Sequence, residues 1–336
     1  MIPETMRAAV ITRFGGPDVL EIQEVPTPRP GVGEVLVRVR ASALNRADLL
    51  QRAGNYPAPP GAAASIPGLE FAGEVVARGM GVTRWRDEAR VFGIIGGGAH
   101  AEYVVAREEE LAPVPSSLDW IQAGAVPEAF ITAHDALVTQ ARLAAGERVL
   151  IHAVGSGVGL AAAQLIRALG AVPFGTARSA DKIDRAREHG LEAGVAVVGD
   201  HQVIVDACSV WSDGRGVGVI LDLVGGDYVA TDVTVAAPGC RIMLIGTVAG
   251  RSATLPLGAV LGKRLRLIGS VMRGRSSREK ADATAAFAAD VVPMLERGVV
   301  SPVIDGVFPL EQIRAAHERL ASNETFGKVA LAIAPD

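Results

Sequence analysis

One glycine-containing turn constrains the fold of this chain more than any other feature. Residues 148–153 have the composition of a buried strand, and an apolar helix is expected at 158–169. A tight strand-to-helix turn favours glycine, because it uses backbone angles closed to residues with a Cβ. Glycines also let a diphosphate approach the free amides at the start of a helix. We therefore predict a dinucleotide site, against the alternative of a merely structural turn, at Gly155, Ser156, Gly157, Val158 and Gly159.

The rest of the second half alternates strand-like and helix-like runs. Strands are expected at 148–153, 172–176, 219–223, 241–245 and 265–268. Helices are expected at 158–169, 180–189 and 278–297. Gly170 and Gly190 end the first two helices, where a left-handed cap is wanted. Alternation at this spacing predicts a doubly wound, parallel Rossmann sheet.

The first 110 residues have a different texture. Short β-rich runs are separated by clusters of Gly and Pro, at 8–11, 35–39, 72–77 and 103–106. This pattern predicts a barrel-like or sandwich-like β domain. A chain of 336 residues favours two domains. We expect the segment beyond Arg273 to rejoin the N-terminal domain.

Composition excludes several classes of protein. A 49% hydrophobic fraction fits a well-buried fold, and a net charge of −4 argues against nucleic acid as a partner. Charge or glycine interrupts every apolar run before bilayer length, and the stretch Met1–Arg7 lacks a signal-peptide pattern. Cys208 and Cys240 cannot build a disulfide framework. We expect a cytoplasmic protein that does not bind membranes.

The end of the second Rossmann strand indicates which dinucleotide binds. NAD sites place an acidic residue there, whereas this chain has Arg178 and Ser179, with Lys182 one turn later. A guanidinium, a hydroxyl and an ammonium suit a 2′-phosphate, so these residues predict NADPH. Asp181 is interpreted as a helix cap. The alternative is that Arg178 and Lys182 form an ordinary solvated helix start.

The segment Pro67–Val75, the β-rich first domain and the glycine turn together resemble the medium-chain dehydrogenase/reductase superfamily. Its zinc alcohol dehydrogenases carry Gly-His-Glu where this chain has Gly68-Leu69-Glu70, and a catalytic Cys where it has Asn45. The four-cysteine structural zinc lobe is also absent. Zinc needs Cys, His or carboxylate ligands, so no metal is expected. The histidines are interpreted as ordinary helix or strand residues at His134, His152, His189 and His317.

Within that superfamily the chain is similar to the zinc-free quinone oxidoreductase branch over nearly its whole length. Segments 45–57 and 127–133 match the branch, and Ser156 with segments 263–265, 269–273 and 326–329 match its tumour-suppressor-inducible subgroup. The resemblance implies a GroES-like domain at 1–124, completed by 272–336. It also implies an NADP-binding Rossmann domain at 125–271.

The resemblance further implies where the site lies. Asn45 and Tyr56 are expected beside the nicotinamide and the substrate as catalytic residues, with Tyr56 either donating its hydroxyl or only walling the pocket. Further cofactor contacts are expected from Asn45, Thr132, Val224, Gly246, Thr247, Asn323 and Lys328. Asp222 either lies near the cofactor or caps the core. His100 either protonates an intermediate or, as we favour, is a surface histidine.

The chain also departs from its relatives. They commonly have Asn-Tyr after the third Rossmann strand, where this chain has Gly199-Asp200, and glycine where it has Arg178. The phosphate is therefore expected to depend more on Arg178 and less on an aromatic ring. No structure is assigned to Asp206–Gly216.

Without a metal to polarise a carbonyl, the expected reaction is hydride transfer to an electron-poor acceptor, either a quinone or a small α,β-unsaturated carbonyl. An enoyl-thioester reductase and a non-enzymatic nucleotide-binding protein are the alternatives. Family resemblance also implies a homodimer, formed through the edge strand at 265–270.

Overall fold

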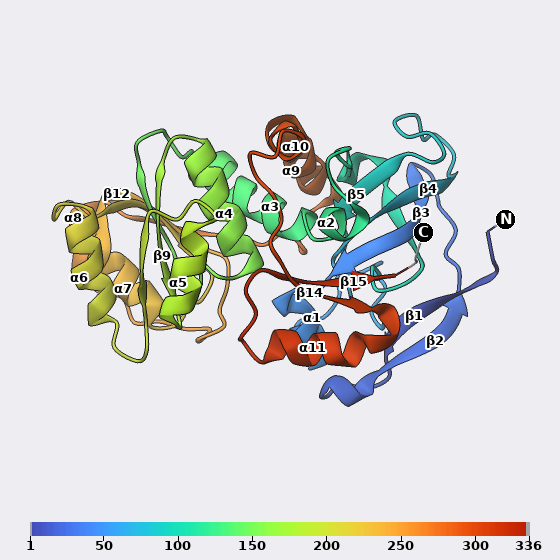
Figure 1. The fold of residues 1–336 in the computed structure, drawn as a ribbon, viewed down its shortest axis with the longest axis horizontal. Helices are drawn as coiled ribbons and strands as arrows, with labels where there is room; N and C mark the ends of the chain where they lie inside the picture. Colours follow the sequence, from blue (N-terminus) through green and yellow to red (C-terminus); the bar gives the residue numbers. More distant parts are fainter. Residues whose placement is uncertain (1, 334–336) are drawn as a thin grey trace. The chain divides into compact units, whose positions relative to one another are not determined.

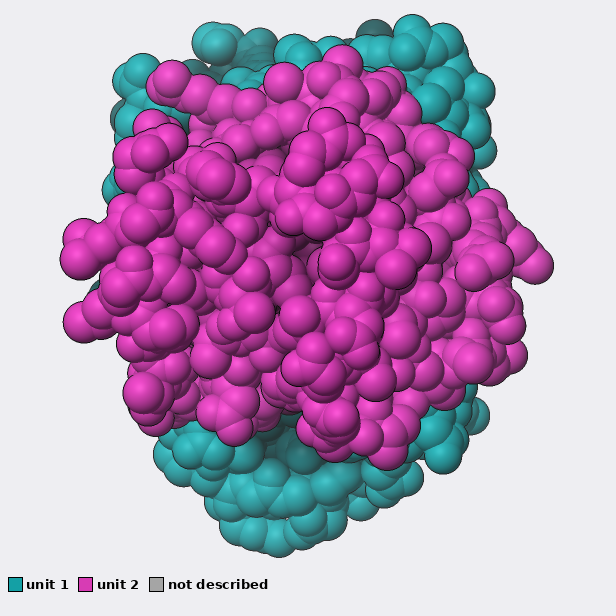
Figure 2. Space-filling view, turned by 90° about the vertical axis from the view of Figure 1, so that its left-hand side faces the viewer, with its two compact units in different colours: residues 1–131, 272–336 teal, residues 132–271 magenta. Residues whose placement is uncertain are grey.

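The computed structural model describes residues 2–333. The chain forms two compact units (Figure 2): unit 1 comprises Met1–Ile131 and Met272–Asp336, and unit 2 comprises Thr132–Val271. Each unit has its own sheet and its own buried core. No helix within residues 2–333 is both long enough and apolar enough to cross a membrane.

Unit 1 is built on a seven-stranded sheet with the order β14-β15-β3-β4-β5-β7, and β6 pairs with β3 (Figure 1). Its strands are β3 (Glu34–Ala43), β4 (Glu70–Arg78), β5 (Arg90–Ile94), β6 (Tyr103–Arg107), β7 (Leu111–Pro113), β14 (Ile304–Pro309) and β15 (Lys328–Ala332). A separate antiparallel pair consists of β1 (Thr5–Ile11) and β2 (Leu20–Pro26). Because β15 pairs with β3, the C-terminal tail and the N-terminal segment share one sheet.

The helices of unit 1 lie between these strands and beyond β13. They are α1 (Arg46–Arg52), α2 (Trp120–Gly124), α9 (Ser277–Asp290), α10 (Val292–Glu296) and α11 (Ile313–Ala321). The single helix expected at 278–297 is wrong, because the chain breaks at Val291 and restarts as α10. Pro293 stands in the first turn of α10, where its missing N–H costs nothing.

Unit 2 contains a six-stranded sheet with the order β10-β9-β8-β11-β12-β13, and all its neighbouring strands are parallel. The strands are β8 (Arg148–Ile151), β9 (Val172–Ala177), β10 (Ala193–Ala196), β11 (Val217–Asp222), β12 (Ala236–Leu244) and β13 (Arg266–Gly269). This is the order of a doubly wound nucleotide-binding sheet, as the alternation of strands and helices predicts.

The helices of unit 2 follow its strands. They are α4 (Gly157–Ala168), α5 (Ala180–Arg187), α6 (Gln202–Trp211), α7 (Tyr228–Val235) and α8 (Leu257–Lys263). α3 (Pro127–His134) spans the boundary between the units, and π-helical backbone follows it at Asp135–Gln140. The unassigned stretch 206–216 contains the end of α6 and a turn in which Gly214 and Gly216 have positive φ.

Candidate functional site

The glycine turn of unit 2 joins β8 to α4. Ser156 caps α4, since its Oγ accepts a hydrogen bond of 3.1 Å from the amide of Gly159. The left-handed backbone of the turn belongs to Ala153, with φ of 53°. Gly159 is required for space, because a Cβ there would come within 2.7 Å of the Ala153 carbonyl oxygen and of Val154 backbone atoms. The prediction that a glycine takes the left-handed backbone conformation of this turn is therefore wrong, because Ala153 takes it.

Two further turns of unit 2 follow the carboxyl ends of β11 and β12. The Oδ1 atom of Asp222 accepts hydrogen bonds of 2.8 Å from the amides of both Val224 and Gly225. A Cβ on Gly225 would come within 2.7 Å of the Gly246 carbonyl oxygen, so the two turns pack backbone against backbone. Asp222 is fully buried and its Oδ2 has no hydrogen-bond partner. It caps this turn, which is one of its two expected roles.

The end of β9 carries the residues expected to bind a phosphate. Arg178 is exposed and Ser179 caps α5, accepting from the amide of Lys182. Asp181 was expected to be the cap, and that is wrong: it lies within the first turn and its carboxylate is 3.7 Å from Arg185. Serine is the better cap here because its backbone is extended at the position before the first helical residue.

Two aromatic rings at the strand ends of unit 2 were not singled out from the sequence. His201 follows β10 and Tyr228 begins α7, and their ring centroids are 4.3 Å apart. Burial raises the pKa of Tyr228, and nearby Arg178 opposes that rise. The phenol of Tyr228 therefore lies within electrostatic reach of the Arg178 guanidinium.

A buried network lies next to the glycine turn. His152 has no exposed surface; its Nε2 is 2.7 Å from the Asp232 carboxylate and its Nδ1 is 2.9 Å from the Thr176 hydroxyl. Burial works against a charge on His152, but Asp232 prevails and raises its pKa. Burial also raises the pKa of Asp232 to about 6. His152 is thus a member of a buried, hydrogen-bonded pair with Asp232, which its interpretation as an ordinary strand residue missed.

In unit 1, a lysine ammonium is held among oxygen atoms. Lys328, at the start of β15, places its Nζ 2.6 Å from Glu70 Oε1, 2.6 Å from Asn45 Oδ1 and 3.0 Å from the Leu44 carbonyl oxygen. Asn45 Nδ2 also donates to Glu70 Oε1 at 2.8 Å. Glu70 is fully buried and Lys328 nearly so. The three donors of the ammonium are therefore all used, and both ends of the Asn45 amide are fixed.

Glu128 joins this cluster from the first turn of α3. Its backbone amide donates to Glu70 Oε2 at 2.8 Å. Its own Oε2 has neither solvent contact nor a hydrogen-bond partner. Burial, and after it the charge of Glu70, raises the pKa of Glu128 to about 8. Neither Glu128 nor Glu70 has a role predicted from the sequence, although both lie in segments that resemble the family.

Tyr56 lies against an arginine. The Arg273 guanidinium is 4.9 Å from the centre of the Tyr56 ring, and it donates to the Tyr56 carbonyl oxygen. It also bonds the side chain of Gln51 and the Gly96 carbonyl oxygen. Burial raises the pKa of Tyr56, Arg273 lowers it, and Glu128 raises it again. Arg273 was quoted only as part of a family segment, and the structure shows that it fixes the loop that carries Tyr56.

His100 is not a surface histidine, and that interpretation is wrong. The residue is fully buried, both ring nitrogens lack a hydrogen-bond partner, and burial lowers its pKa. Its ring meets that of His317 edge-on, with centroids 6.3 Å apart. The chain turns inward here through Gly97 and Gly98, both with positive φ, which the glycine run alone did not reveal.

The remaining expected residues are less closely grouped. Asn323 accepts a hydrogen bond of 2.8 Å from the Arg46 guanidinium. It lies in the short turn between α11 and β15, which begins at Lys328. Thr132 has a buried hydroxyl oxygen with no hydrogen-bond partner. Thr247 is exposed after β12.

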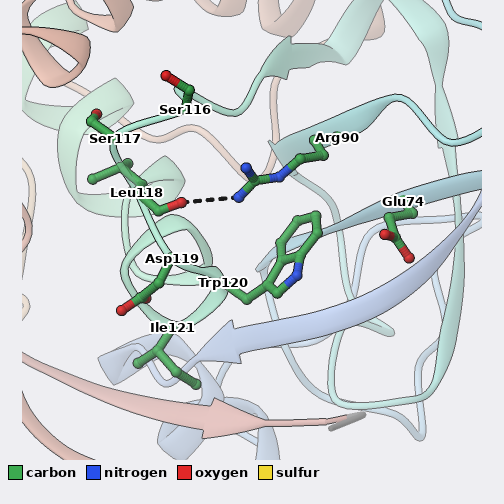
Figure 3. Close-up of a pocket in the computed structure, with 8 residues that line it drawn as sticks. All are labelled: Glu74, Arg90, Ser116, Ser117, Leu118, Asp119, Trp120 and Ile121. Carbon is green, nitrogen blue, oxygen red and sulfur yellow. Dashed lines mark hydrogen bonds between the residues drawn. The ribbon is translucent and has the colours of Figure 1, made fainter. Parts of the chain in front are cut away.

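An open hollow on unit 1 holds none of these residues (Figure 3). It is lined by Glu74, Arg90 and residues 116–121, and the Arg90 guanidinium lies 4.4 Å from the centre of the Trp120 ring. Glu74 is four residues along β4 from Glu70, which is ~13 Å in a strand. The hollow is therefore separate from the Lys328 cluster.

Two known protein families match the two halves of the chain. A family described as "Alcohol dehydrogenase GroES-like domain" matches residues 31–116, and one described as "Zinc-binding dehydrogenase" matches residues 157–289. The chain is 34% identical to a quinone oxidoreductase of Pseudomonas aeruginosa, over 95% of this chain and 97% of that one.

Solved structures agree with this relationship. A quinone oxidoreductase of Pseudomonas syringae has a TM-score of 0.87 at 29% identity, covering 98% of this chain and 100% of that one. The CurF ER cyclopropanase from the curacin A biosynthetic pathway has a TM-score of 0.86 at 26% identity, covering 99% and 100%. The chain belongs to the quinone oxidoreductase branch of the medium-chain dehydrogenase/reductase superfamily and is an oxidoreductase of that family.

Proposed function

We propose that this oxidoreductase uses NADPH to reduce a quinone or a small α,β-unsaturated carbonyl by hydride transfer, without a metal ion. The observation that carries the proposal is the Lys328 ammonium, bound between Asn45 and Glu70. By the resemblance, Asn45 and Glu70 stand where zinc-dependent relatives have their catalytic Cys and the Glu of Gly-His-Glu, and Lys328 bonds both.

The residues present do not fit zinc. Zinc is held by Cys, His or carboxylate ligands, but Leu69 is apolar and buried, and the amide of Asn45 already bonds Lys328 and Glu70. A divalent cation near Glu70 Oε1 would also face an ammonium 2.6 Å from that oxygen. Among residues 2–333 there is no group of three His, Cys, Asp or Glu side chains that could hold a metal. The ammonium of Lys328 beside Glu70 therefore disfavours a second cation at this carboxylate.

The residues of unit 2 do fit a dinucleotide, whose reduced nicotinamide supplies the hydride when bound. The start of α4 offers backbone amides beside Gly159, where a Cβ would clash with the turn. Residues of the adjoining strand ends would complete the site, namely Gly155, Ser156, Gly157, Val158, Val224, Gly246 and Thr247. The exposed Arg178 would hold the 2′-phosphate together with Ser179 and Lys182. Tyr228, close enough to Arg178 for its pKa to respond to the arginine charge, would provide the aromatic ring that Gly199-Asp200 lacks.

Unit 1 supplies polar groups for the acceptor. Asn45 is held rigidly by Lys328 and Glu70, and Tyr56 is held by Arg273. Without a Lewis acid, the acceptor must already be electron-poor, and hydrogen-bond donors then stabilise the charge that develops on its oxygen. A quinone or an enone meets this requirement, whereas a simple alcohol does not.

A steady-state panel tests the proposal. NADPH and NADH are each offered with quinones, 2-alkenals and enoyl thioesters; the last class is included because of the likeness to the CurF ER cyclopropanase. We expect quinones or alkenals to be reduced with NADPH, and metal analysis to find no stoichiometric zinc. Preference for enoyl thioesters would favour the alternative function, and no oxidation with any acceptor would refute both.

The phosphate assignment has its own test. We expect Arg178→Ala to weaken NADPH binding about tenfold and to leave NADH binding unchanged, because a charge-assisted contact to phosphate contributes roughly 1.5 kcal/mol. Equilibrium titration of nucleotide fluorescence measures both affinities. Arg185→Ala, which alters an exposed arginine of α5, the helix that follows Arg178, is the control. Equal weakening of NADPH and NADH would contradict the assignment.

We further propose that two copies associate through β13, the edge strand of the unit 2 sheet. Unpaired backbone groups on an edge strand can pair with a second copy. Light scattering is expected to give the mass of a dimer. The two buried, unpaired cysteines suit the reducing cytoplasm, where we place the enzyme.

A further inference from the structure

We propose that Glu128 is the proton donor of the reaction: it holds a proton at neutral pH and passes it to the oxygen of the acceptor. The inference rests on the proposed function, because it names the group that completes that reduction. Hydride transfer alone leaves a negative charge on the acceptor, so a proton must come from another source.

The contacts of three carboxyl groups in unit 1 distinguish Glu128 from its neighbours. Asp48 accepts hydrogen bonds from the amides of Asn45 and Gly68, at 2.7 and 2.9 Å. Glu70 accepts from Lys328, from Asn45 and from the amide of Glu128. Glu128 Oε2 receives no donor at all, and it has no contact with solvent. A carboxylate needs such donors when it is buried, so Glu128 is the member of the three that is favoured in its neutral form.

The charges around Glu128 lead to the same conclusion. The groups that face it are Glu70 on β4, Asp48 on α1, Lys328 on β15, and Arg273 after β13. The pKa of Tyr56, in the loop after α1, is also raised by the charge of Glu128, and the Tyr56 phenol is neutral near pH 7. Two carboxylates and two cations already balance, so an ionised Glu128 would add an uncompensated negative charge. Burial and Glu70 accordingly raise the pKa of Glu128 to about 8.

A general acid works best when its pKa lies near the working pH, because it is then both protonated and ready to release the proton. Glu128 meets this condition and retains part of its surface exposed, although Oε2 itself is covered. Lys328 and Arg273 lower the pKa of Glu128, so they stabilise the carboxylate that remains after transfer.

The step balances for an enone as follows. The β-carbon of the acceptor gains a hydride and forms a C–H bond, and the electron pair of the C=C bond moves toward the carbonyl oxygen. The O–H bond of Glu128 breaks, and its proton joins that oxygen to give the enol, which tautomerises to the ketone. The acceptor is reduced by two electrons, the nicotinamide is oxidised by two electrons, and solvent returns a proton to Glu128.

The first test follows the rate against pH. In the wild type, kcat/KM for an enone is expected to fall above about pH 8, as Glu128 loses its proton. Glu128→Gln is expected to lower kcat about 100-fold or more and to abolish this alkaline limb, with nucleotide affinity unchanged. Glu128→Asp, which restores a carboxyl group, is expected to restore the limb at a reduced rate. A Glu128→Gln enzyme with the wild-type rate and pH profile would overturn the inference.

A matched control separates proton donation from simple burial. Glu110 is also buried in unit 1, and burial raises its pKa, but its neighbours are Lys280, Ser277, Arg107 and Glu109 and not the Lys328 cluster. Glu110→Gln is expected to keep the wild-type rate and pH profile. Loss of the alkaline limb in Glu110→Gln as well would overturn the assignment to Glu128.

The second test needs no cofactor or acceptor. Infrared spectra of the wild type are expected to show a protonated carboxyl group at pH 7 that titrates near pH 8 and is missing from Glu128→Gln. Identical carboxyl bands in the two proteins would overturn the inference. If the wild type oxidised NADPH with none of the acceptors offered, the proposed function would fail instead, and these spectra would still decide the protonation of Glu128.

Discussion

The two units present their candidate functional groups in different ways. Unit 2 offers backbone: the amides at the start of α4 and the closely packed turns at Gly225 and Gly246. Unit 1 offers buried ionisable side chains, of which Lys328, Glu70 and Glu128 lie within one hydrogen-bonded cluster. A backbone site depends on the space left by missing side chains, whereas a charge cluster depends on each partner being present. Substitutions should therefore act differently in the two units.

The largest effect is expected in the charge cluster of unit 1. Lys328→Met removes the only cation within hydrogen-bond distance of Glu70 among the described contacts and leaves a buried carboxylate uncompensated. Removing one partner of a buried pair costs about 3–5 kcal/mol, so the free energy of unfolding should fall by that amount. Urea denaturation followed by circular dichroism measures the change.

Two further variants sharpen this prediction. Adding Glu70→Gln to Lys328→Met should return part of the lost stability, because it removes the uncompensated charge. Arg13→Met breaks an exposed ion pair of unit 1, with 2.7 Å between Arg13 and Asp18, and should cost less than ~1 kcal/mol. If the effects of Lys328→Met and Glu70→Gln were simply additive, the two residues would not form the coupled pair described here.

In the backbone site of unit 2, adding a single methyl group should be enough to cause damage. Gly159→Ala would place a Cβ within 2.7 Å of backbone atoms of Ala153 and Val154, which cannot move aside like a side chain. Overpacking of this kind costs roughly 1–3 kcal/mol. The start of α4 would shift, so nucleotide affinity should fall about tenfold, as measured by equilibrium titration.

The control for this substitution has the opposite sign. Gly262 lies in α8 of the same unit, and no atom stands within 4 Å of an added Cβ. Gly262→Ala should stabilise the helix by up to ~1 kcal/mol and leave nucleotide affinity unchanged. Unchanged nucleotide affinity in Gly159→Ala would show that the turn tolerates a side chain and would refute the steric argument.

The same difference explains what could be predicted from the sequence. The glycine turn and the strand–helix alternation are local patterns, and they predicted the parallel sheet of unit 2 and the place of α4. The cluster of unit 1 has no local signature, since Glu70 and Glu128 are 58 residues apart and Lys328 and Asn45 are 283 apart. The pairing of β15 with β3, and of β3 with β4, brings Lys328, Asn45 and Glu70 together, and the first turn of α3 adds Glu128.

The errors have different causes. Burial of His100 is a tertiary property that depends on how the Gly97-Gly98 backbone turns, so composition suggested a surface residue instead. The break between α9 and α10 did have a local signal in Pro293, which the expected helix ignored. The left-handed angle of the glycine turn was expected at one of its glycines. It belongs to Ala153 instead, although a residue with a Cβ rarely takes such an angle.

The smallest predicted effect concerns Ser156, whose side chain accepts a hydrogen bond at the start of α4. Its Oγ caps α4 through the Gly159 amide, so Ser156→Ala should cost about 1 kcal/mol, whereas Ser156→Gly should cost only a few tenths. Denaturation midpoints of the three proteins measure the order. Glycine should replace serine better than alanine does, because it leaves the helix end open to water. If alanine were the better replacement, the cap would contribute little and the turn would depend on its backbone alone.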